Sequence, residues 1–151
     1  MLIGPEEFSH LDPSTTYKKT SDPTGLYNCI AWAAGFSNKW WWPDKFKIGF
    51  WPPTAKREEK LEAFAQAFAT IGYEKCNNGN LEEGFEKIAL YAVPNPLGRW
   101  IPTHAARQLP TGEWTSKMGA YEDITHTTLE ALCDSSYGTA VHFFKRPRLN
   151  Q

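Results

Sequence analysis

The sequence predicts an α+β fold in which helices pack on a small antiparallel sheet, and three observations support this expectation. Residues 55–71 place their apolar side chains at helical spacing. Several short apolar runs separated by turn signals follow, as they do in antiparallel sheets. The chain has 151 residues, of which 41% are hydrophobic, which suits one domain with its own core. We therefore expect a single domain over residues 1–151.

The first helix is expected after an irregular lead-in. Residues 1–26 are rich in Pro, Ser, Thr and Asp and show no sustained periodicity. Asn28 is a good helix N-cap, and the short apolar run from Cys29 ends before Gly35. Cys29 should therefore lie in the first turn of a short helix.

A tryptophan- and proline-rich loop, residues 37–53, is expected to separate this helix from the next one. Thr54 is the expected N-cap of the helix over residues 55–71, and Gly72 supplies its end. The apolar stripe of that helix predicts a surface for it to cover.

The remaining sequence predicts the sheet that this helix covers. Five short runs have strand character: Tyr73–Cys76, Lys87–Val93, Thr103–Gln108, Trp114–Lys117 and Thr139–Lys145. A Pro-Thr-Gly turn at residues 110–112 makes the third and fourth runs a candidate hairpin. A further short helix is expected near residues 129–133.

Charge and cysteine content narrow the function classes. The chain has 16 Lys and Arg against 17 Asp and Glu, so no global field attracts nucleic acid or an acidic membrane. The three cysteines form no C-x-x-C motif, which favours a reducing compartment over a disulfide framework or a zinc ribbon. The N-terminal residues lack the basic and apolar regions of a signal peptide. We expect cytoplasmic residence, although export without a cleavable signal would leave the same sequence.

A thiol at a helix start is the sharpest candidate for chemistry. Unpaired backbone N–H groups and the helix dipole favour thiolate there, which points to Cys29. Nucleophilic catalysis also requires a nearby base, and His104 falls in an expected strand that can pack against this helix.

The order of these motifs resembles the small NlpC/P60 and CHAP-like branch of the papain-like cysteine hydrolases, which are bacterial amidases and peptidases. The similarity rests on Y-N-C at residues 27–29, an apolar strand at residues 86–91 and T-H-A-A-R-Q at residues 103–108. Two departures indicate a divergent bacterial family. Ile30 follows the cysteine where serine is usual, and Ser116 stands at the third catalytic position, where His, Asn, Gln or an acid is usual.

The resemblance implies a papain-like core and a cysteine hydrolase acting on an amide, peptide or isopeptide bond. Cys29 would attack as thiolate and His104 would protonate the leaving nitrogen, with Ser116 as the group that orients the histidine. A peptide, peptidoglycan or protein is the implied substrate, and no metal or organic cofactor is implied. Because a one-residue change of register flips side chains, Thr115, Lys117 and Gln108 remain alternatives to Ser116. These three are taken from the same hairpin.

Binding residues follow from the same resemblance. The Cys29 backbone N–H is the expected first oxyanion donor, with Asn28 or the Tyr27 region as the second. Trp42 can stack on substrate or anchor the loop to the core, and Arg107 can bind a carboxylate or remain an exposed strand charge.

Other functions remain open at this point. Acyl transfer to an amine and deamidation of glutamine would use the same machinery, and a secreted bacterial effector is compatible with the chemistry. The alternative is a non-catalytic interaction domain of the same fold, in which Cys29 is a buried core thiol. His126 is interpreted as a helix-start residue, with a partner role in the site as the other interpretation. The sequence leaves the oligomeric state undetermined.

Overall fold

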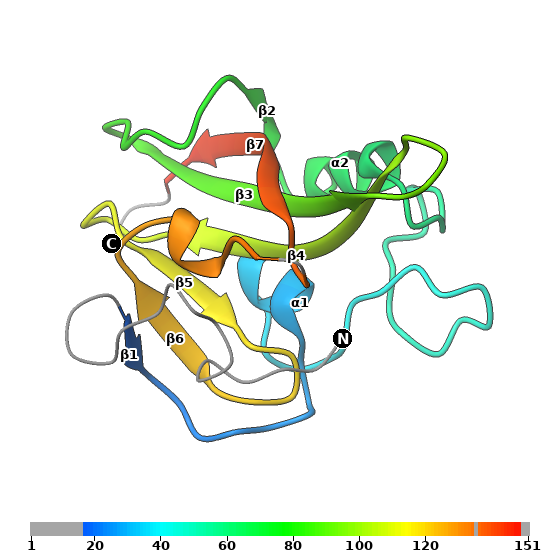
Figure 1. Ribbon diagram of the computed structural model, residues 1–151, viewed down its shortest axis with the longest axis horizontal. Helices are drawn as coiled ribbons and strands as arrows, with labels where there is room; N and C mark the ends of the chain where they lie inside the picture. Colours follow the sequence, from blue (N-terminus) through cyan, green and yellow to red (C-terminus); the bar gives the residue numbers. More distant parts are fainter. Residues whose placement is uncertain (1–16, 135, 149–151) are drawn as a thin grey trace.

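One antiparallel sheet dominates the computed structural model, which describes residues 17–134 and 136–148 (Figure 1). Seven strands lie in the spatial order β1-β6-β5-β4-β3-β7-β2, and every neighbouring pair is antiparallel. Their bounds are β1 Tyr17–Lys19, β2 Glu74–Cys76, β3 Phe85–Pro94, β4 Trp100–Gln108, β5 Trp114–Lys117, β6 Asp123–His126 and β7 Thr139–Pro147.

The helices of the described chain are short. Helix α1 spans Cys29–Ala33 and α2 spans Leu61–Ala69, five and nine residues respectively. The helix expected near residues 129–133 is a single 3-10 turn, Glu130–Leu132. No helix among the described residues combines the length and apolar character needed to cross a membrane.

The expected α+β class, with helices packed on a small sheet around a papain-like core, is therefore wrong. The protein is β-rich, because the sheet is larger and the second helix shorter than the sequence pattern predicts. Residues before Leu61 do not continue α2. The Trp51 indole donates to the Lys56 carbonyl at 2.8 Å, and the Lys56 N–H donates to Gln66 of α2 at 2.8 Å. These contacts fold the segment back along the helix.

The ends of α2 also differ from expectation. Lys60, without a side-chain cap, precedes the helix, so Thr54 is not its N-cap. Pro52 and Pro53 lie just before Thr54, and the backbone there forms turns rather than helix.

All five expected strands are present, β5 with the expected bounds and the other four with at least one shifted end, and two more strands were not predicted. Strand β1 lies in the expected irregular lead-in, of which residues 1–16 are outside the described part of the chain. Strand β6 follows β5 directly across a turn. Both strands have only three or four residues, too few for alternation to stand out.

The sheet separates two hydrophobic clusters. The helix-side cluster contains α1 and α2 residues together with the strand residues Ile88, Leu90, Ala105 and Phe144. The opposite cluster contains Ala89, Tyr91, Ala106, Trp114 and Tyr137 among its members. Successive strand residues alternate between these clusters, as the pleat requires. The segment between α1 and α2, cyan in Figure 1, extends away from the sheet.

Candidate active site

Asn28 begins α1 and ties it to the tryptophan-rich loop. Its Oδ1 accepts the Ala31 N–H at 3.1 Å, the usual N-cap bond, and the Trp41 N–H at 3.0 Å. Its Nδ2 donates to the Trp41 carbonyl at 2.6 Å. One side chain thus sets both the helix start, with Cys29 as first residue, and the position of the loop beside it.

A cavity of about 410 Å³ lies at this junction, within the size range of small-ligand sites. Its walls come from α1, the tryptophan-rich loop, the segment before α2, β4, the turn after β5 and the segment that follows the 3-10 turn Glu130–Leu132. The lining residues are Asn28, Cys29, Trp40, Trp42, Glu59, Thr103, Gly119 and Tyr137. Cys29 therefore lines an open cavity, although only 8% of its surface is exposed.

The Cys29 thiol is protonated at neutral pH. Burial raises its pKa to about 11, and the lowering effect of the Ala105 and Ile30 backbone groups is smaller. A five-residue helix supplies little dipole to oppose this desolvation. The thiolate expected from the helix start is thus not the resting form.

His104 is fully buried in an aromatic setting. Its ring stacks on Tyr137 with centroids 4.2 Å apart and 10° between planes, and it meets Tyr91 edge-on at 5.3 Å. Burial lowers the pKa of His104 well below its ordinary value, and His126 lowers it further. The ring is therefore neutral, so the resting site holds no thiolate–imidazolium pair.

A chain of hydrogen bonds runs from His104 across β5 to β6. His104 Nε2 lies 3.0 Å from Ser116 Oγ, which lies 2.8 Å from His126 Nε2. His126 Nδ1 lies 2.8 Å from the Thr128 carbonyl oxygen. We call these four residues the imidazole relay.

The carbonyl at the end fixes the direction of every proton in the relay. A carbonyl oxygen only accepts, so His126 Nδ1 carries hydrogen; burial lowers the pKa of His126 to about 4, so its Nε2 is bare. The Ser116 hydroxyl then donates to that nitrogen and accepts from His104 Nε2–H. His104 Nδ1 consequently carries a free lone pair, and it is buried without a hydrogen-bond partner.

Cys29 and His104 pack in different hydrophobic environments. Cys29 and Ala105 belong to the helix-side cluster, whereas the Tyr91 and Tyr137 rings that contact His104 belong to the opposite one. No hydrogen bond joins the thiol to His104 Nδ1. The β3–β4 register skips Thr103, a bulge residue that lines the cavity with Cys29 and Tyr137.

Of the four residues considered for orienting His104, Ser116 is the one bonded to it. The Thr115 hydroxyl accepts from the Trp32 indole at 2.9 Å, and Gln108 donates to the Gly79 carbonyl. The Lys117 ammonium donates to the carbonyls of Thr24, Gly119 and Tyr121.

The expected binding residues divide into two groups. Asn28 and Trp42 line the cavity. Tyr27 and Arg107 do not: the Tyr27 hydroxyl donates to Asp123 at 2.7 Å, and Arg107 donates to the Trp32 carbonyl and lies over that indole. Burial raises the pKa of Tyr27 to about 12, so its hydroxyl stays a donor.

Sequence reasoning missed four cavity residues and misplaced His126. Glu59, Thr103, Gly119 and Tyr137 come from segments far apart in the chain, and no local pattern marks them. His126 ends β6 rather than starting a helix. The alternation in D-I-T-H, residues 123–126, is the signal available for that strand, and it is four residues long.

Within residues 17–134 and 136–148, no three His, Cys, Asp or Glu side chains gather closely enough to hold a metal ion. The reactive group in the cavity wall is the Cys29 thiol, and the His104 imidazole stacks on Tyr137 of the same wall.

Comparison with protein families gives one match. The model of a family described as "Domain of unknown function (DUF7689)" matches residues 18–145, most of the chain. Neither the comparison with curated proteins nor that with solved structures found a match.

Proposed function

The chain belongs to the DUF7689 family, whose description assigns no activity, and we propose from the site that it is a cysteine-dependent hydrolase of amide bonds. A peptide, a peptidoglycan stem or a protein would supply the bond. The observation that carries the proposal is a cavity lined by Cys29 and by Tyr137, whose ring stacks on the buried imidazole of His104; Nδ1 of that imidazole is unprotonated and has no hydrogen-bond partner.

In the proposed reaction, Cys29 Sγ attacks the amide carbonyl while His104 Nδ1 takes the thiol proton. The new C–S bond forms, the C–N bond breaks, and the proton passes to the leaving nitrogen. Water then attacks the thioester with His104 again as base, which yields the carboxylic acid and restores the thiol. The balance is amide plus water giving acid plus amine.

Two donors are available for the oxyanion. As first residue of α1, Cys29 has a backbone N–H without a partner inside the helix. Asn28 lines the cavity, and its Nδ2 has a second hydrogen beyond the one given to Trp41. Donors aimed at developing negative charge stabilise acyl-transfer transition states.

The resting pair is neutral, so the proton must move when substrate binds. Hydrogen bonds between catalytic groups often tighten only in the substrate complex. The relay supports this step because it holds His104 in the one neutral tautomer that has Nδ1 as acceptor. In the free protein, Cys29 should react with iodoacetamide about 100-fold more slowly at pH 8 than an ordinary thiol, because its pKa is near 11 rather than 9.

A reducing compartment suits a free nucleophilic thiol. Cys29, Cys76 and Cys133 are all unpaired. We include cytoplasmic residence in the proposal on this ground.

The test is acylation of Cys29 by an activated acyl donor. The folded protein is incubated with N-acetyl-norleucine p-nitrophenyl ester, p-nitrophenolate release is followed, and the acylated residue is identified by mass spectrometry. We expect a burst of product, a transient acyl group on Cys29 and continued turnover. Cys29→Ala should abolish both phases.

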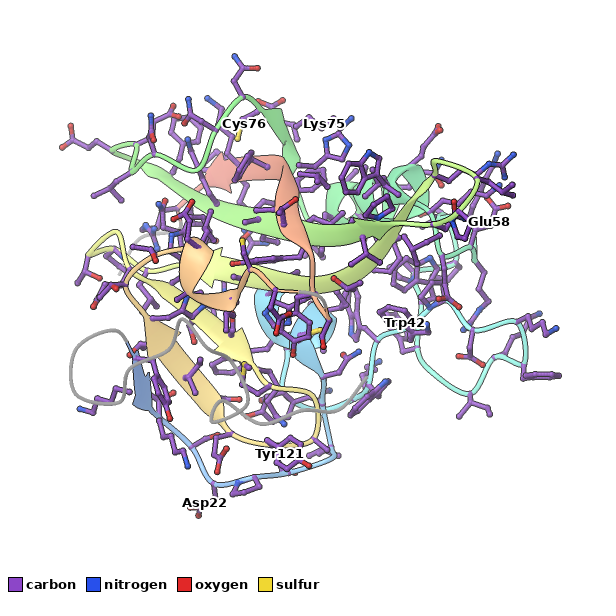
Figure 2. All side chains as sticks on the ribbon, in the orientation of Figure 1. Asp22, Trp42, Glu58, Lys75, Cys76 and Tyr121 are labelled. Atoms are coloured by element: carbon purple, nitrogen blue, oxygen red, sulfur yellow. The ribbon has the colours of Figure 1, made fainter. Side chains whose placement is uncertain are left out.

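Matched variants separate catalysis from general thiol reactivity. Cys76 is the last residue of β2 and lies well away from the cavity residue Trp42 in Figure 2, so Cys76→Ala should behave as the parent protein. His104→Gln keeps a donor for Ser116 but lacks the imidazole, and it should slow acylation at least 100-fold while the protein stays folded. Acylation of Cys76 or Cys133 with none at Cys29 would reject the proposal in favour of a non-catalytic interaction domain.

A further inference from the structure

The charge in the cavity has one sign. Glu59 is the one ionic side chain among the lining residues, and the same lining includes the aromatic residues Trp40, Trp42 and Tyr137. An acidic group beside aromatic faces is the combination that binds organic cations, since the carboxylate supplies charge and the ring faces are electron-rich.

Glu59 is an exposed residue at the cavity, and its carboxylate has no partner in the described part of the protein. It has no hydrogen bond or ion pair within that part, whereas its two nearest cations in sequence, Lys60 and Arg57, are both in ion pairs. Lys60 pairs with Glu58 at 3.4 Å, and Arg57 pairs with Asp44 at 3.2 Å. Lys117, the buried cation near Cys29, gives its three protons to carbonyl oxygens and does not line the cavity.

The cavity tryptophans also differ from other aromatic residues of the chain. Lysine and arginine side chains lie over six aromatic rings elsewhere: Tyr27, Trp32, Phe46, Phe50, Tyr73 and Phe85. Lys39, the residue before Trp40, lies over Phe50 with its ammonium 4.1 Å from the ring centre. Within the described chain, no such cation covers Trp40 or Trp42.

The Trp42 indole and the backbone that carries Trp40 are held in place. Trp42 packs edge-to-face on Phe64 of α2 with centroids 5.4 Å apart, and the Trp40 carbonyl accepts the Phe50 N–H at 2.8 Å. Asn28 anchors the Trp41 backbone between them. A site whose walls are already ordered loses little conformational entropy when it binds.

We propose that this cavity binds a cationic side chain of the acyl donor, of the lysine, ornithine or arginine class, with its charge at Glu59 and its alkyl stem against Trp40 and Trp42. The inference rests on the proposed function, because Cys29 on the same wall would attack the carbonyl of that residue. Its substrate is therefore an amide in which a basic residue supplies the acyl group.

The test compares three p-nitrophenyl esters that differ in one side chain: N-acetyl-lysine, N-acetyl-norleucine and N-acetyl-glutamate. Norleucine has the alkyl stem of lysine without the charge. We expect Cys29 to be acylated at least 10-fold faster by the lysyl ester than by the norleucyl ester, and slowest by the glutamyl ester. Glu59→Gln should lower the ratio of the lysyl rate to the norleucyl rate from at least 10 to about one.

Glu58→Gln is the matched control, because Glu58 is adjacent, carries the same charge and does not line the cavity. It should leave all three rates unchanged. Equal lysyl and norleucyl rates, or a lysyl preference that survives Glu59→Gln, would overturn the inference while leaving the proposed hydrolase intact.

A binding measurement separates the two proposals when no ester reacts. In Cys29→Ala, N-acetyl-lysinamide should change tryptophan fluorescence at a concentration at least 10-fold lower than N-acetyl-norleucinamide requires. Adding Glu59→Gln should remove that difference. Such binding without acylation would retain the cation site and reject the hydrolase. Loss of both results would reject both.

Discussion

Ser116 and Lys117 are consecutive residues of β5 and have no exposed surface, yet their buried polar groups are satisfied by different kinds of partner. Ser116 joins two histidines that burial keeps neutral. Lys117 places its ammonium among three carbonyl oxygens at 2.6 to 2.7 Å. Because they are neighbours on a strand, their side chains leave the sheet on opposite faces.

The difference shows what each polar group does for the cavity. The relay transmits a hydrogen-bond direction from the Thr128 carbonyl to His104 and so sets a tautomer. The lysine holds backbone in place, including the carbonyl of Gly119, which lines the cavity. The relay therefore sets the protonation of His104, and the lysine fixes the backbone at the cavity wall.

Removing the Lys117 ammonium should have the largest effect on stability. Lys117→Met leaves three buried carbonyls without their donor, and we expect the free energy of unfolding to fall by about 3 kcal/mol or more in urea titrations. Lys18→Met, at an exposed position of β1, should change it by less than about 0.5 kcal/mol. A loss under about 1 kcal/mol for Lys117→Met would show that the clamp does not stabilise the fold.

Cutting the relay should cost less and change a different observable. Ser116→Ala leaves His104 Nε2 and His126 Nε2 unpaired, with an expected loss of about 2 kcal/mol. In ¹⁵N NMR, His104 Nδ1 of the parent protein should resonate as unprotonated, and the variant should show mixed tautomers. Thr115→Ala also removes a buried, bonded hydroxyl but should leave the His104 tautomer unchanged. Mixed tautomers in the parent protein would contradict the relay.

Acid should destabilise the relay gradually. The pKa of His126 falls from 6.5 to about 4 on folding, so below pH 6.5 the unfolded chain takes up a proton that the folded chain refuses. Stability should therefore fall by up to about 1.4 kcal/mol per pH unit for this histidine between pH 6 and pH 4. His126→Gln should show a shallower decline than the parent protein in denaturation curves across that range. If stability declines equally in both proteins, a group other than His126 causes the acid sensitivity.

The smallest effect is expected beside the lysine. The Tyr27 hydroxyl donates to Asp123, and burial raises the pKa of that carboxyl while Lys117 lowers it. Tyr27→Phe removes the donor and should reduce unfolding free energy by about 1 kcal/mol. The Asp123 pKa should rise further in ¹³C NMR titration. No change in that titration would mean that Lys117 alone sets the charge of Asp123.

Local sequence signals located the main parts of the candidate site. Asn28 predicted a helix starting at Cys29, because an N-cap bond spans only three residues. Alternation along residues 103–108 and a turn at residues 110–112 placed His104 and Ser116 on adjacent strands. Whether these residues catalyse a reaction stays a prediction.

Other features depended on contacts that no local pattern contains. The fold class was wrong because helical periodicity before Leu61 yields to contacts of Trp51 and Gln66 with Lys56, and because β1 and β6 are very short. The thiolate expectation did not hold since burial outweighs the helix start at Cys29.

The sequence by itself determined where α1 begins and which strand carries His104, since each follows from spacing within a few residues, whereas the choice of Ser116 among the β5 residues came from the structure. Tertiary structure alone decided that His126 and Thr128 complete the relay, that Glu59 shares a cavity with Cys29, and that both candidate catalytic groups rest uncharged. These outcomes depend on desolvation and on pairing between distant segments, which exist only once the chain has folded.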